Sequence, residues 1–175
     1  MVTLIQNIAS LVTVDTRGKN IKIGSEMREI GEIRNGAVLF NENIIFTGTT
    51  EETQKYVSAN NIEVGEILSA DGKTILPGFA DSHTHIVFAG NRSDEFAKRL
   101  RGATYEEIAQ EGGGIQRTMN ATRKATFNEL VENGLKLAKS AISYGTTTIE
   151  IKSGYSLNLE GEIKQHRAIR QLKTE

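Results

Sequence analysis

The second half of the chain alternates between strand-like and helical patterns, and this alternation restricts the fold more than any other feature. A strand-like run over residues 74–79 leads into a segment with two histidines, after which helical spacing dominates. Thr126 and Glu129 form a Thr-x-x-Glu capping pattern that opens one helix, and a β-branched run follows at residues 146–151. A second amphipathic helix is predicted from about Leu159. Strand, helix, strand and helix in this order predict an α/β fold built from parallel β/α units.

The first half of the chain has a different residue pattern, in which short strand-like runs are interrupted by Gly, Asn and Asp. Residues 41–43, Asn-Glu-Asn, are typical of a hairpin turn because Asn tolerates left-handed backbone conformations. The change of pattern near residues 70–76 predicts a small β domain over 1–74 and a β/α domain over 75–175. The elements expected in the β domain are strands over residues 9–14, 36–40, 44–48 and 62–69 and a short helix over residues 50–60.

Composition excludes several classes of protein. The net charge is −1 and there is no long Lys/Arg run, so nucleic acid is not expected as a partner. The chain has no cysteine, which removes disulfides and thiolate metal ligands and leaves nitrogen and oxygen donors for any metal. Neither a signal peptide nor a membrane-spanning segment is predicted, so we expect a cytoplasmic protein without a membrane partner.

The pattern His-x-His at His83 and His85 is the strongest chemical signal. Alternate residues of a strand share a face, so Asp81, His83 and His85 are expected to project to one side. If this segment is a buried barrel strand, its C-terminal end is where catalytic residues gather, and two imidazoles there can hold a divalent metal. Asp81 then suits the orientation of a ligand imidazole. A chance His-x-His is the alternative, but the position directly after a Pro-Gly strand entry favours the metal site.

Other polar residues allow more than one interpretation. Glu150 and Lys152 share a face of the second predicted strand, and a structural ion pair between them is favoured over a direct catalytic role. The run Gly112–Gly114 could bring backbone N–H groups to an anionic substrate, although a flexible loop is the commoner use of three glycines. His166 lies among charged residues of the second helix and is expected at the surface, not as a third ligand.

Residues 76–85 resemble the Pro-Gly-x-x-Asp-x-His-x-His signature of the amidohydrolase superfamily. Members of that superfamily combine a metal-bearing (β/α)₈ TIM barrel with a small β-sandwich built from both ends of the chain. Further segments occur in an order that resembles the imidazolonepropionase family, which hydrolyses a cyclic amide in histidine degradation, and the β domain resembles it more loosely. These segments are residues 86–92, 101–105, 112–115, 121–123 and 150–155.

The resemblance implies roles for individual residues. His83 and His85 match two ligands of a single zinc or iron ion, divalent or trivalent, while Arg92 and Tyr155 match residues that bind substrate. The planar guanidinium of Arg92 suits a substrate carboxylate. The implied reaction is hydrolysis of 4-imidazolone-5-propanoate to N-formimidoyl-L-glutamate. The resemblance places the remaining metal ligands and the general acid/base beyond residue 175.

The same resemblance implies that the chain is only the N-terminal part of such an enzyme. The predicted β/α domain suffices for two β/α units, whereas a closed barrel has eight. We therefore expect this chain alone to be inactive and the complete protein to be a homodimer. Two other readings stay open: a different amidohydrolase, such as another cyclic amidase or a nucleobase deaminase, and a non-enzymatic binding or structural fragment.

Overall fold

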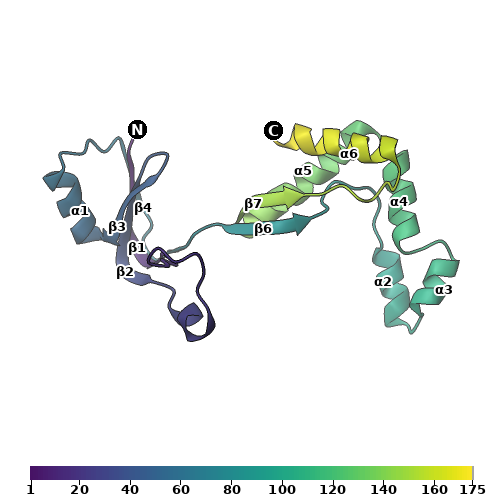
Figure 1. The fold of residues 1–175 in the computed structure, drawn as a ribbon, viewed down its shortest axis with the longest axis horizontal. Helices are drawn as coiled ribbons and strands as arrows, with labels where there is room; N and C mark the ends of the chain where they lie inside the picture. Colours follow the sequence, from purple (N-terminus) through teal and green to yellow (C-terminus); the bar gives the residue numbers. More distant parts are fainter. Residues whose placement is uncertain (175) are drawn as a thin grey trace. The chain divides into compact units, whose positions relative to one another are not determined.

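The computed structural model describes residues 1–174, so Glu175, the last residue of the predicted β/α domain, lies outside the described residues. The chain divides into two compact units, Met1–Pro77 and Gly78–Glu175 (Figure 1). Within residues 1–174, no helix combines the length and the apolar character needed to cross a membrane.

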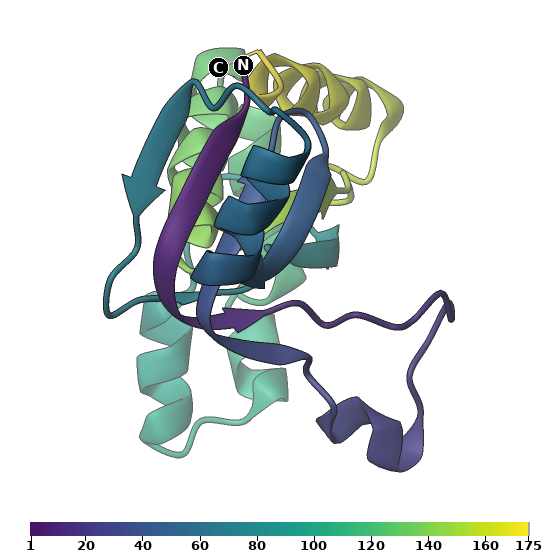
Figure 2. The same cartoon turned by 90° about the vertical axis from the view of Figure 1, so that its left-hand side faces the viewer.

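The first unit is a mixed sheet with one helix against it. Its sheet order is β3-β2-β1-β4, and β5 also pairs with β1. The pairs β1–β2 and β2–β3 are antiparallel, whereas β4 and β5 run parallel to β1. Figure 2 shows α1 lying across one face of this sheet. The elements are β1 (Thr3–Val12), β2 (Glu32–Phe40), β3 (Ile44–Thr49), α1 (Thr50–Ala59), β4 (Glu66–Ser69) and β5 (Thr74–Ile75).

The first strand differs from its prediction. It begins at Thr3, six residues before the expected start, and ends at Val12. A register shift lies between Ile5 and Ile8, where Asn7 has a φ of 58° and donates its backbone N–H to Thr50. This bulge interrupts the alternation of apolar and polar residues, which is why the pattern concealed the first half of the strand.

Two further predictions in this unit need correction. Only Glu66–Ser69 of the expected 62–69 strand pairs, because Ile62 and Val64 pack instead against the core beside α1. The 41–43 turn does join β2 to β3, but none of its residues has a positive φ. Asn43 instead donates its backbone N–H to the side chain of Asn41 at 2.9 Å. The segment between β1 and β2 contains a short helix, η1 (Gly24–Arg28), and extends away from the sheet (Figure 2).

As far as residue 174, the second unit contains two parallel strands and five helices, which confirms the predicted α/β class and the parallel β/α arrangement. The strands β6 (Phe79–Thr84) and β7 (Thr146–Ile151) pair with each other. The helix expected from Thr126 and the helix expected from Leu159 are both present. The helices are α2 (Ser93–Leu100), α3 (Tyr105–Gln110), α4 (Ile115–Lys124), α5 (Phe127–Ser143) and α6 (Leu159–Leu172).

The strand that carries the histidines begins directly after the Pro-Gly of residues 77 and 78, as expected, but it is not buried within residues 1–174. The strand-like run 74–79 is divided between β5, which pairs with β1, and β6, which begins at Phe79. Residues 79–83 are exposed, since β7 is the one strand that pairs with β6 in residues 1–174. Gly78 lies directly before β6, and a Cβ atom there would fall 2.1 Å from Thr147 Oγ1. Only glycine therefore lets the chain enter β6 beside β7.

The helices of the second unit are fixed by caps and a small core. Thr126 accepts from the N–H of Glu129, and Glu129 accepts in return from the N–H of Thr126, as the sequence predicts. Leu130 is fully buried against Val87 and Ala168, which joins α5 and α6 to the segment after β6. Lys164 of α6 donates to the carbonyl groups that end α4: Ala125 at 2.7 Å, Arg123 at 2.9 Å and Thr122 at 3.3 Å.

Candidate functional site

Two histidines meet at the end of β6. His83 lies near the end of the strand, and His85 follows directly after it. Their Nε2 atoms are 3.2 Å apart, and their ring centroids are 5.2 Å apart with 52° between the planes. The side chains therefore lie on the same side of the backbone, as the alternation along a strand predicts.

The spacing of the two Nε2 atoms fits a shared cation. Two Nε2 atoms come this close only if one of them carries a proton that it donates to the other, or if both lone pairs face a cation that lies between them. Nitrogens at the usual distance from a tetrahedral zinc are about 3.3–3.4 Å apart, close to the observed 3.2 Å. Within residues 1–174, no three His, Asp or Glu side chains gather into a metal-holding group. The described residues thus bring two nitrogen donors together, fewer than the four that a tetrahedral zinc site needs.

The surroundings of His83 and His85 are polar on one side and aromatic on the other. Asp81 accepts the backbone N–H of His83 at 3.2 Å, so its carboxylate shapes the strand end and does not touch an imidazole. Tyr155 lies beside His85, with ring centroids 5.4 Å apart. Phe88 and Tyr155 pack edge to face, with ring centroids 5.5 Å apart. In residues 1–174, the buried Nδ1 atom of His85 has no hydrogen-bond partner. The imidazole is held by ring packing.

Glycine at position 154 permits this close packing. Gly154 has a φ of +141°, a conformation that residues with side chains rarely adopt. A Cβ atom there would lie 3.3 Å from His85 Cε1 and 3.5 Å from His85 Nδ1. The turn after β7 therefore carries Tyr155 to His85 without a side chain in between.

Glu150 and Lys152 form an ion pair at the end of β7. The hydrogen bond from the Lys152 ammonium lowers the pKa of the Glu150 carboxyl, and the positive charge of Lys152 acts in the same direction. Thr84 ties this end of β7 to β6: its hydroxyl donates to the Glu150 carbonyl at 2.7 Å, and its carbonyl accepts the Lys152 N–H at 2.8 Å. The structural ion pair favoured from sequence is present.

Arg92 is held in place by Glu95, an acid that no motif in the sequence marks as functional. Its Nε donates to Glu95 Oε2 at 2.7 Å, and the Glu95 side chain is only 6% exposed. Arg92 lines a cavity of about 270 Å³ formed with residues of α2 and α3, including Arg99 and Tyr105. In the described part of the chain, Arg92 makes no hydrogen bond to the histidines. The structure brings His83, His85 and Tyr155 together but leaves Arg92 outside that group.

The three glycines at residues 112–114 use their backbone N–H groups for hydrogen bonds within the protein. Each of the three N–H groups already has a protein acceptor: Gly112 donates to Ala109 O at 3.0 Å, Gly113 to Ile108 O at 2.9 Å and Gly114 to Glu95 Oε1 at 3.0 Å. These N–H groups are therefore engaged within the described residues. The predicted surface position of His166 is confirmed, with its Nε2 3.1 Å from Ser153 Oγ.

Comparison with known sequences identifies imidazolonepropionases among the relatives of this chain. The chain is 47% identical over 173 residues to the imidazolonepropionase of Alkaliphilus oremlandii, an alignment that covers 97% of this chain and 39% of that protein. It is 41% identical over 171 residues to the imidazolonepropionase of Parabacteroides distasonis, covering 97% and 40%. The chain thus spans about two fifths of the length of these relatives. No protein-family model matches it.

Comparison with solved structures gives the fold alone, since the sequence identities are low. Guanine deaminase from E. coli aligns with a TM-score of 0.62 at 17% identity, over 99% of this chain and 34% of that one. An atrazine chlorohydrolase from Arthrobacter aurescens in complex with zinc gives 0.58 at 15%, over 98% and 34%. A metal-dependent hydrolase from Pyrococcus horikoshii gives 0.55 at 14%, over 99% and 46%.

Proposed function

Because this chain is related to the imidazolonepropionases along nearly its whole length, we propose that it supplies part of the active site of a metal-dependent hydrolase of that kind. The proposed reaction converts 4-imidazolone-5-propanoate to N-formimidoyl-L-glutamate. In this proposal residues 75–175 are the first β/α units of a (β/α)₈ barrel, and residues 1–74 belong to a β-sandwich. The observation that supports it best is the 3.2 Å separation of the two Nε2 atoms at the end of β6.

We assign His83 and His85 as two ligands of one zinc or iron ion. Both rings are neutral when they bind through Nε2, so they leave the charge of the ion undiminished. A bound ion of this kind supplies Lewis acidity and lowers the pKa of a water molecule. The packing of Tyr155 against His85 restricts rotation of the imidazole. Asp81 fixes the backbone that carries His83, which is a positioning role.

Arg92 and Tyr155 are the proposed contacts to the substrate. The Nη1 and Nη2 atoms of Arg92 suit the two oxygens of a carboxylate, and the ring of Tyr155 suits stacking on or hydrogen bonding to a five-membered ring. Glu150 stays ionised and paired with Lys152, so a supporting role suits both better than proton transfer. The general acid/base and the remaining ligands are proposed to come from outside this chain.

A hybrid protein tests the proposal. In the hybrid, this chain replaces the matching segment of the Alkaliphilus oremlandii imidazolonepropionase, whose unaltered form is the positive control. The hybrid is expected to bind metal in elemental analysis and to consume 4-imidazolone-5-propanoate, followed by the ring absorbance. His83→Ala and His85→Ala should each abolish both properties, while His166→Ala, at an exposed histidine of α6, should keep both. A folded hybrid that neither binds metal nor turns over substrate refutes the proposal.

The other amidohydrolase chemistries make a different prediction at Arg92. A nucleobase has no carboxylate for a guanidinium to bind, so Arg92→Ala would leave its affinity unchanged. For the proposed substrate the same variant should raise KM by about a hundredfold, since a charge-assisted pair is lost. Equal KM values for Arg92→Ala and the parent hybrid would therefore favour a different substrate.

A further inference from the structure

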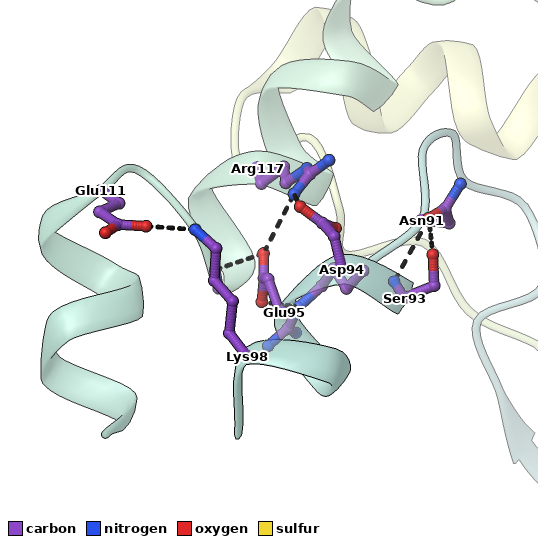
Figure 3. A network of polar contacts seen from close by, with 9 residues as sticks. Asn91, Ser93, Asp94, Glu95, Lys98, Glu111 and Arg117 are labelled. Carbon is purple, nitrogen blue, oxygen red and sulfur yellow. Dashed lines mark hydrogen bonds and ion pairs between the residues drawn. The ribbon is translucent and has the colours of Figure 1, made fainter. Parts of the chain in front are cut away.

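Glu95 is a buried acid whose two oxygens have separate partners. Oε2 accepts from Arg92 Nε at 2.7 Å, and Oε1 accepts from the backbone N–H of Gly114 at 3.0 Å. Arg117 lies 3.9 Å from Oε1 and pairs more closely with Asp94, at 2.6 Å (Figure 3). Only 6% of the Glu95 side chain is exposed. Burying a charged carboxylate costs free energy unless hydrogen bonds and an opposite charge offset the loss of water, and the partners of Glu95 provide both.

The segment 112–114 is built to reach this carboxylate. A Cβ atom at Gly113 would lie 2.6 Å from Ile108 Cγ2, 2.7 Å from Ile108 O and 3.0 Å from Glu95 Oε1, so the backbone approaches as closely as only glycine allows. Gly112 and Gly114 have φ values of 78° and 69°. The loop before α4 is thereby fixed onto the helix that follows Arg92.

We propose that Glu95 is a positioning residue for carboxylate recognition by Arg92, an inference that rests on the proposed function. The bond to Glu95 uses the Nε edge of the guanidinium. Nη1 and Nη2 have no partner within residues 1–174, and the Arg92 side chain is 45% exposed. The guanidinium group of Arg92 is planar. A hydrogen bond that fixes its Nε atom therefore also fixes the direction in which the two Nη groups point their N–H bonds. Glu95 in turn is anchored at Gly114, so the loop before α4 sets the orientation of the guanidinium.

The test uses Glu95→Gln in the hybrid protein, with Asp94→Asn as the matched control. Asp94 is the neighbouring acid, also paired with an arginine, but it does not contact Arg92. Glu95→Gln should raise KM for 4-imidazolone-5-propanoate by about tenfold with kcat little changed, since a charge-assisted hydrogen bond is roughly twice as strong as a neutral one. Asp94→Asn should leave KM as in the parent. An equal effect of both variants, or of neither, overturns the proposal.

Two comparisons separate positioning from general damage to the fold. A ring substrate without the propionate chain should show the same kcat/KM with Glu95→Gln as with the parent. In an Arg92→Ala background, Glu95→Gln should have no further effect on KM, because the two residues act as one unit. Loss of activity towards the carboxylate-free substrate, or additive effects in the double variant, contradicts the inference.

A measurement without turnover keeps the inference distinct from the proposed function. In NMR spectra of the ¹⁵N-arginine-labelled hybrid, the Hε proton of Arg92 should exchange more slowly than that of Arg99, which lines the same cavity and has no ion pair in residues 1–174. Sodium propionate should shift the Arg92 signals in the parent and not in Glu95→Gln. A folded but inactive parent refutes the proposed function, whereas fast Arg92 exchange, or propionate shifts unchanged by Glu95→Gln, refutes the inference.

Discussion

Gly154→Ala should weaken metal binding through the ring of His85. The added Cβ would lie 3.3 Å from Cε1 and 3.5 Å from Nδ1, whereas carbon atoms in contact prefer about 3.5–4.0 Å. The ring must therefore move by about 0.3 Å, which alters the 3.2 Å separation of the two Nε2 atoms. Disturbing the support of a metal ligand typically lowers affinity by about 10–100-fold, and we expect about tenfold for so small a shift.

The control for Gly154→Ala is Gly102→Ala. Gly102 also has a positive φ, +98°, but an added Cβ would meet no atom within 4 Å. Both variants should lose about 1–3 kcal/mol of stability to backbone strain, so a difference in metal affinity isolates the contact with His85. The assay is competition between the hybrid protein and a chelator at fixed pH, with urea denaturation for stability. Equal metal affinity in the two variants would show that this contact does not position the imidazole.

Three further predictions concern the second unit. Leu130→Ala should lower the free energy of unfolding by about 3 kcal/mol, because Leu130 is fully buried; urea denaturation checks this, and a loss no larger than in Leu137→Ala, at a 38% exposed position, would contradict it. Thr126→Ala should cost about 1 kcal/mol and Thr126→Ser little, as measured by the same denaturation. Hydrogen bonds from the backbone N–H and the hydroxyl of Thr126 lower the pKa of the Glu129 carboxyl below its ordinary 4.5. The resulting stabilisation is complete above pH 4.5 and is lost as the pH falls through the lowered pKa, so Glu129→Gln should flatten the acid side of the stability curve and an unchanged curve would refute this.

Signals from a few neighbouring residues were sufficient to predict several helices and strands of the second unit. The Thr126 and Glu129 pair marked the start of α5, and the β-branched run marked β7, because both signals are confined to a few neighbouring residues. The same Thr-x-x-Glu pattern opens α3, where Thr104 and Glu107 form a capping box. Period-two alternation likewise sufficed to put the two histidines on one side.

Features that depend on contacts between residues far apart in the sequence could not be predicted from such local signals. Glu95 is three residues from Arg92, which is a readable ion-pair spacing, but its burial depends on Gly114, nineteen residues further along. The division of the 74–79 run depends on which strand each half pairs with, β1 for one and β7 for the other. Asn7 in β1 shows the same limit, since its bulge is supported by Thr50 from the start of α1.

The tight fit of Gly78 against Thr147 makes the geometry of the histidines depend on a residue outside the group of His83, His85 and Tyr155. Any larger residue at position 78 would push the start of β6 away from β7 and carry the imidazoles with it, five and seven positions downstream. In a library of single variants selected for metal retention, position 78 should tolerate as few replacements as His83 itself. Such a survey would show that the contact between Gly78 and Thr147 matters for metal retention as much as the proposed ligand His83 does.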